Sequence, residues 1–67
     1  MNAFDVYINE DWVNRVFDSE TDPSEVRRSL INHDGYCPYI EVHRAKGNMP
    51  NGRCWTEDEI CQGYRND

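Results

Sequence analysis

Three cysteines and two histidines are the side chains of this 67-residue chain that suggest metal or nucleophilic chemistry. Zinc is the first candidate, because metal binding supplies folding free energy to a chain too short for a large core. Gaps of 16 and 6 residues separate the cysteines and no Cys-x-x-Cys pair occurs, so the spacing matches no standard zinc site. We expect free or buried thiols, and a zinc-stabilised module stays an alternative hypothesis. Its candidate ligands are His33, Cys37, Cys54 and Cys61.

A cysteine nucleophile with His33 or His43 as its base is the second chemistry that these residues offer. Such a pair needs a site that stabilises the thiolate and a cleft for the substrate. A chain of this length has little room for either, and it carries no motif with a known catalytic mechanism. We therefore predict that the protein is not an enzyme, uses no cofactor and takes no small-molecule substrate.

Charge is spread unevenly along the chain, whose 13 acids and 7 bases give a net charge of -6. Residues 1–26 hold seven acids and one base, a net -6. Residues 27–55 hold two acids and five bases, a net +3, and residues 56–67 hold four acids and one base, a net -3. Such asymmetry bears on partners rather than on the fold.

Acidic and aromatic side chains near the start of the chain form the main candidate binding site. Carboxylates arranged in this way can imitate nucleic-acid phosphates and occupy a basic cleft, while exposed aromatic rings can anchor a protein partner. The alternative is ordinary surface charge. We predict a protein partner with a basic surface, contacted through Tyr7, Glu10, Asp11, Trp12, Asp18, Glu20 and Trp55.

The basic middle of the chain is an alternative candidate, a nucleic-acid-contacting face in which aromatic rings stack between cations. The net charge of -6 is opposite to the usual basic footprint of such proteins, so we predict no nucleic-acid partner. The residues of this alternative face are Arg27, Arg28, Arg44, Lys46 and Arg53 with Tyr36, Tyr39 and Trp55.

Two strands joined by a turn are predicted at the start of the chain. Residues 3–9 alternate apolar and polar side chains, which is typical of a half-buried strand and places Asp5 and Tyr7 on the outer face. Residues 9–11 are turn formers, and residues 12–18 form the second strand of a hairpin. The register of this second strand stays ambiguous, because large apolar side chains fall on both of its faces.

A helix is predicted over residues 23–33. Asp22 is its candidate N-cap, Glu25 has the spacing of a capping box, and Pro23 occupies the first helical position. Gly35 can take the left-handed conformation that ends a helix.

A third strand is predicted over residues 39–45, followed by a loop over 46–54 and a short helix over 57–64. Thr56 with Glu59 has the spacing of a second capping box, and Trp55 with Ile60 that of a hydrophobic staple.

These elements predict an α+β fold in one domain, with a ββαβ core over residues 1–45 and a loop and short helix over 46–67. The sheet has three antiparallel strands in the order 2-1-3 and is crossed by one helix. Its other face is either uncovered, or covered by the C-terminal helix with Trp55 in the core. The predicted core residues are Phe4, Val6, Ile8, Val26, Leu30, Ile40 and Val42.

The pattern over residues 3–45 resembles small uncharacterised ββαβ proteins encoded by tailed bacteriophages. The segment Leu30-Ile31-Asn32-His33-Asp34-Gly35-Tyr36 carries the most distinctive part of the resemblance. It implies a phage accessory protein that binds a host bacterial protein and inhibits or modulates it. The tail from residue 46 lies outside this pattern.

Location is predicted from what the sequence lacks. It has no apolar run of about 18 residues, and its N-terminus has no basic head followed by an apolar stretch. Three cysteines are an odd number, which favours reduced thiols. We expect no membrane partner and a cytoplasmic location, in the host bacterium if the protein is phage-encoded.

Overall fold

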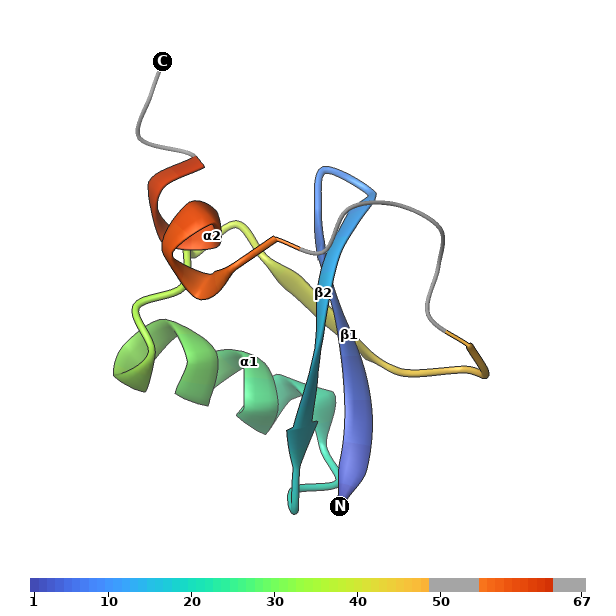
Figure 1. The fold of residues 1–67 in the computed structure, drawn as a ribbon. Helices are drawn as coiled ribbons and strands as arrows, with labels where there is room; N and C mark the ends of the chain where they lie inside the picture. Colours follow the sequence, from blue (N-terminus) through green and yellow to red (C-terminus); the bar gives the residue numbers. More distant parts are fainter. Residues whose placement is uncertain (49–54, 64–67) are drawn as a thin grey trace.

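The computed structural model describes residues 1–48 and 55–63, with the backbone alone at residues 57, 62 and 63. A three-stranded antiparallel sheet has the order β2-β1-β3, so β1 is its central strand (Figure 1). The predicted α+β fold and strand order are confirmed. Along the chain, the elements are β1 (Asn2–Ile8), β2 (Asp11–Asp18), α1 (Pro23–His33), β3 (Glu41–Arg44) and α2 (Glu57–Gly63).

A two-residue turn joins β1 to β2, and it is tighter than the predicted turn over residues 9–11. Ile8 pairs with Asp11, which leaves Asn9 and Glu10 at the corner with φ of 50° and 71°. Positive φ at both corner residues is the mark of a type I′ turn, whose twist matches that of the flanking strands. Asn tolerates this conformation, whereas Glu is strained in it.

Replacing Glu10 by glycine is expected to raise the free energy of unfolding by about 0.5–1 kcal/mol, because glycine has no Cβ to clash at positive φ. Urea melts of the two proteins would measure the gain. Ser19→Gly is the matched control, since Ser19 has no positive φ and the same change there should give no gain. Equal midpoints for Glu10→Gly and the wild type would show that the turn is not strained.

A β-bulge in β2 resolves the register that the sequence left ambiguous. Val6 pairs with Asn14 while Tyr7 pairs with Trp12, so Val13 is the extra residue between them. The bulge lets Val13 and Asn14 both be buried on the inner face of the sheet. Trp12 consequently lies on the outer face, beside Tyr7.

Helix α1 begins and ends at the predicted residues, 23 and 33. Asp22 Oδ1 accepts a hydrogen bond from the Ser24 N–H at 2.9 Å, and Gly35 has φ of 74° just after the helix. The predicted return bond from Glu25 is not made. Glu20 Oε1 instead accepts from the Asp22 N–H at 3.5 Å, so the capping-box part of the prediction is wrong.

Asp22→Ala is expected to lower the free energy of unfolding by about 1 kcal/mol, because the Ser24 N–H loses its acceptor at the start of α1. Asp22→Asn, which keeps an oxygen in the same place, should cost less than half as much. Thermal or urea melts would compare the three proteins. If the alanine variant melts like the wild type, the cap makes no net contribution.

Strand β3 is shorter than the predicted strand over residues 39–45. Its start is delayed by a turn in which the Ile40 N–H donates to Cys37 O at 3.2 Å. Arg27 of α1 holds this turn, since its guanidinium donates to Pro38 O at 2.7 Å and to Ile40 O at 2.8 Å.

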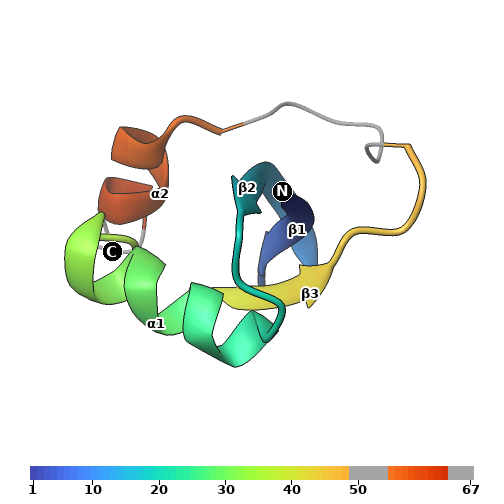
Figure 2. The same cartoon turned by 90° about the horizontal axis from the view of Figure 1, so that it is seen from below.

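Both helices pack on the inner face of the sheet (Figure 2). Ile60 of α2 is fully buried in the same core cluster as Val26 and Leu30 of α1. Trp55 packs against this cluster, and its backbone N–H donates to the backbone oxygen of Val13 at 2.6 Å. The C-terminal helix therefore completes the inner core. All the predicted core residues are buried, and the structure adds Val13, Tyr36, Cys37 and Ile60.

The start of α2 carries the second predicted capping box. Glu59 Oε1 accepts from the Thr56 N–H at 2.9 Å, and Thr56 Oγ1 accepts from the Glu59 N–H at 3.2 Å. This reciprocal pair satisfies two donors that a short helix would otherwise leave exposed. Within the described ranges, neither helix has the length and apolar character needed to cross a bilayer.

Candidate functional site

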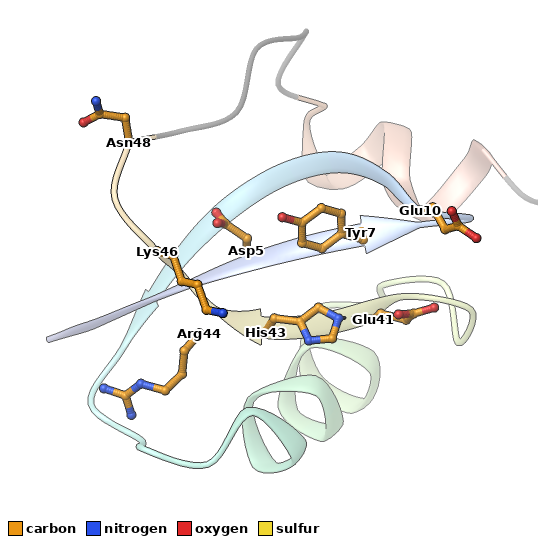
Figure 3. A pocket seen from close by; sticks show the side chains of 8 residues that line it. All are labelled: Asp5, Tyr7, Glu10, Glu41, His43, Arg44, Lys46 and Asn48. Carbon is orange, nitrogen blue, oxygen red and sulfur yellow. Dashed lines mark ion pairs between the residues drawn. The ribbon is translucent and has the colours of Figure 1, made fainter.

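The outer face of the sheet is the side opposite α1 and α2. Neither helix packs on it, and side chains of β1 and β3 project from it (Figure 3). Trp12 and Arg15 of β2 pair with Tyr7 and Asp5 and so belong to the same face. We define the outer face by Asp5 and Tyr7 of β1, Trp12 and Arg15 of β2, and Glu41 and His43 of β3.

A carboxylate–guanidinium pair lies at the centre of the outer face. Arg15 donates to Asp5 through Nε at 2.8 Å and through Nη2 at 3.2 Å. The Trp12 indole N–H donates to the same carboxylate at 3.1 Å. The Asp5 side chain is only 6% exposed and that of Arg15 only 10%. Asp5 was expected to project from this face, and it does, but as a paired and covered group rather than a free negative charge.

The surroundings of Asp5 act on its pKa in opposite directions. Burial raises the pKa of Asp5, whereas the hydrogen bonds from Arg15 and Trp12 and the positive charge of Arg15 lower it. The lowering effects together are larger, so the pKa of Asp5 lies below its ordinary value of 3.8. The carboxylate is therefore ionised at neutral pH and fixes Trp12 in place.

Arg15 also ties the loop after β3 to the outer face. Its Nη1 donates to Gly47 O at 3.1 Å. This contact holds the neighbouring Lys46 and Asn48 along one side of a shallow groove of about 570 Å³.

The groove runs along Tyr7 and His43 and differs in charge between its two ends. The two rings meet edge to face with their centres 5.6 Å apart, and Glu41 lies 3.5 Å from His43 Nε2. Glu10 and Glu41 lie at the hairpin end, whereas Lys46 lies near the opposite end (Figure 3). The groove therefore offers carboxylates beside an aromatic ring at one end and a cation at the other.

The residues predicted to bind a partner fall into separate places. Tyr7, Glu10 and Trp12 come together at the hairpin end of the outer face, and Asp11 adjoins them at the start of β2.

Asp18 and Glu20 lie at the other end of the hairpin, Asp18 as the last residue of β2 and Glu20 in the connection to α1. Their carboxylates accept from the backbone N–H of Glu20 at 2.8 Å and of Thr21 at 2.9 Å. Trp55 packs against the inner core. These three residues are therefore not part of the outer-face groove.

The predicted site lacked four residues of the outer face, which are Asp5, Arg15, Glu41 and His43. Arg15 is the single base among seven acids in residues 1–26, and this isolation was a signal for an internal ion pair. Glu41 and His43 alternate with buried Val42, so their projection from the outer face followed from strand periodicity.

The candidate zinc ligands are not brought together in the part of the chain that the structure describes. No three His, Cys, Asp or Glu side chains in the described ranges form a group able to hold a metal ion. His33 is exposed and Cys37 is buried in the core, while the Cys61 thiol lies 3.8 Å from Asp34 O. Cys54 lies outside the described residues.

Three described residues of the alternative basic and aromatic face have other roles in the fold. Tyr36 is buried in the core, and Arg27 is bound to the backbone of the turn before β3. Arg44 donates to Thr21 O at 3.1 Å and to Asn2 Oδ1 at 3.4 Å. These arginines hold connections between elements. Arg53 lies outside the described residues.

Comparisons with known protein families, with curated proteins and with solved structures found no match.

Proposed function

We propose that this protein acts by binding a partner protein through the hairpin end of its outer face. The observation that carries the proposal is the pairing of Tyr7 with Trp12 on a sheet face against which neither α1 nor α2 packs. Both rings are half-buried, so each presents apolar area to a partner. Aromatic residues of this kind are the commonest anchors of protein interfaces.

The anchors are held in place before binding. The hydrogen bond from Trp12 to Asp5 fixes the indole, and the edge-to-face contact with His43 restrains Tyr7. Side chains that are already ordered lose less conformational entropy on association. This restraint lowers the entropic cost of using the two rings as anchors for a partner.

The charge at this end favours a basic partner surface. Glu10, Asp11 and Glu41 are exposed there, and the whole chain carries -6. Glu10 is held in a strained backbone conformation at the corner of the hairpin. Strain that persists at an exposed residue supports a role in function. Long-range attraction would steer encounter with a cationic surface.

The activity that we propose is inhibition or modulation of a host protein, as implied by the resemblance to small phage proteins. If the partner is a nucleic-acid-processing or defence enzyme, the carboxylates would compete with phosphates for its basic groove. The proposed location is the cytoplasm of the host.

The test is capture of a partner from bacterial lysate, followed by association kinetics. Glu10→Lys combined with Glu41→Lys should slow association about tenfold at low salt. Glu25→Lys with Asp58→Lys is the control, because it makes the same charge change at exposed helix positions. Tyr7→Ala should instead raise the dissociation rate, provided that the variant still melts cooperatively.

Two results would contradict the proposal. Equal slowing by both charge reversals would mean that net charge acts without a specific site. If the Glu10→Lys/Glu41→Lys and Tyr7→Ala variants both bind the partner normally, the outer face is not the interface.

A further inference from the structure

β2 is an edge strand of the sheet (Figure 1). A second groove runs along this strand and is lined by residues of β2, of α1 and of the segment after α1. It has a volume of about 370 Å³ and runs from Asn14 and Asp34 at one end to Phe17 and Asp18 at the other. Val16, Val26 and Leu30 line it between these ends. The groove is separate from the outer face that carries the proposed function.

The register of the sheet shows which backbone groups of β2 are available at this edge. The Ala45 N–H donates to Ala3 O on the β3 side, so the backbone groups of Phe4 and Val6 face β2. Their partners on β2 are Val16 and Asn14, whose own backbone groups therefore face β1.

Arg15 and Phe17 alternate with these residues, so their backbone N–H and C=O groups lie in the plane of the sheet and point away from β1, toward its edge. Such a row of backbone groups is a template for a further strand. The same edge already accepts a backbone donor, because the backbone N–H of Trp55 donates to Val13 O.

Asn14 supplies an independent sign of a missing ligand. It is only 7% exposed and its Nδ2 donates to Tyr36 Oη at 3.0 Å. Its Oδ1 is buried and has no hydrogen-bond partner among the described residues. Buried polar atoms are nearly always hydrogen-bonded. A donor that enters this end of the groove would supply the hydrogen bond that Asn14 Oδ1 lacks among the described residues.

Charge at the two ends of the groove indicates the occupant. Asp34 lies at the C-terminal end of α1, where the helix dipole disfavours an anion and favours a cation. Asp18 places a second carboxylate at the other end. Arg15 adds no free positive charge, because Asp5 neutralises it. A second copy of this chain would bring its own carboxylates to the same edge and be repelled.

We propose that the β2 edge binds an extended peptide segment of another protein, which adds to the sheet as a fourth strand. The segment carries alternating apolar side chains that face Val16, Val26 and Leu30, with Lys or Arg near its ends for Asp18 and Asp34. Main-chain hydrogen bonds to Arg15 and Phe17 supply affinity, and the groove selects the side chains. The exposed Phe17 ring lies on the opposite side of the added strand, where it can pair with an outward-facing side chain.

A display library of random dodecapeptides, selected on the immobilised full chain, tests this proposal. We expect enriched peptides to alternate apolar and other residues and to contain Lys or Arg. Hydrogen exchange shows where the peptide binds. The backbone amides of Arg15 and Phe17 should exchange quickly in the free protein and become protected when a synthetic copy of an enriched peptide is bound.

Matched variants separate backbone pairing from side-chain contact. Phe17→Pro removes one outward N–H without touching the β1–β2 bonds, since proline is tolerated at a sheet edge. It should weaken peptide binding about fivefold to tenfold more than Phe17→Ala does. Asp18→Asn with Asp34→Asn should weaken binding of a lysine-bearing peptide about fivefold and leave a lysine-free version unchanged.

Three outcomes would overturn the inference. The first is a library that yields no binder, or binders that tolerate Phe17→Pro as well as Phe17→Ala. The second is protection of the Arg15 and Phe17 amides that rises with protein concentration alone, which would assign the edge to a second copy. The third is peptide binding lost in Glu10→Lys rather than in Phe17→Pro, which would support the outer face instead.

Discussion

Ile60→Ala is expected to lower the free energy of unfolding by about 3 kcal/mol, the usual cost of truncating a fully buried isoleucine. A chain of this size has only about 3–5 kcal/mol of stability from its core. The variant should therefore be partly unfolded at 25 °C. The effect is large because, among the described side chains of α2, Ile60 is the one buried in the core shared with α1 and the sheet.

Circular dichroism with urea melts would measure this loss. Ile31→Ala is the matched control, because the same atoms are removed from a half-buried position on α1. It should cost about 1 kcal/mol. If the two variants lose equal stability, α2 does not dock as the structure describes, and the short helix would be expected to fray.

Asp5→Ala is the second change with a large expected effect, a loss of about 2–3 kcal/mol. Removing the carboxylate leaves the Arg15 guanidinium and the Trp12 indole N–H without their acceptor, and the Arg15 side chain is too little exposed for water to replace it fully. Replacing Arg15 by methionine in the same chain should restore part of the loss, because the uncompensated charge is then gone. A double variant that is no more stable than Asp5→Ala would contradict the ion-pair explanation.

The same pair predicts how stability depends on pH. The pKa of Asp5 is lower in the folded chain than its ordinary value of 3.8, so the folded state favours the ionised form. Its contribution is therefore fully present above pH of about 4 and is lost as the pH falls through the folded pKa. Melts between pH 6 and pH 2 should show the gap between wild type and Asp5→Ala narrowing in acid. A constant gap would mean that Asp5 is not ionised in the native state.

Local signals predicted most of the fold. The alternation of apolar and polar side chains predicted β1, which is the central strand of the sheet. Asp22 and the Thr56–Glu59 pair marked the helix starts correctly, since caps depend on contacts over two or three residues. These features need no information about distant parts of the chain.

The rest depends on contacts between distant elements, which no local pattern contains. The bulge at Val13 shifts the register of β2, so the faces of that strand could not be assigned from periodicity. Trp55 could belong to a surface or to the core, and the docking of α2 decides between them. Asp5 looked like surface charge because its partner Arg15 lies on the neighbouring strand.

The positions of the two tryptophans make the chain its own spectroscopic probe. Trp12 lies on the outer face with its indole bound to a carboxylate, whereas Trp55 lies against the core on the other side of the sheet. Replacing either one by phenylalanine would leave a single fluorophore. The chain that keeps Trp12 would report events at the outer face, and the chain that keeps Trp55 would report the integrity of the core. Binding of a partner at the outer face and folding of the core could thus be followed separately, by the fluorescence of the two single-tryptophan variants.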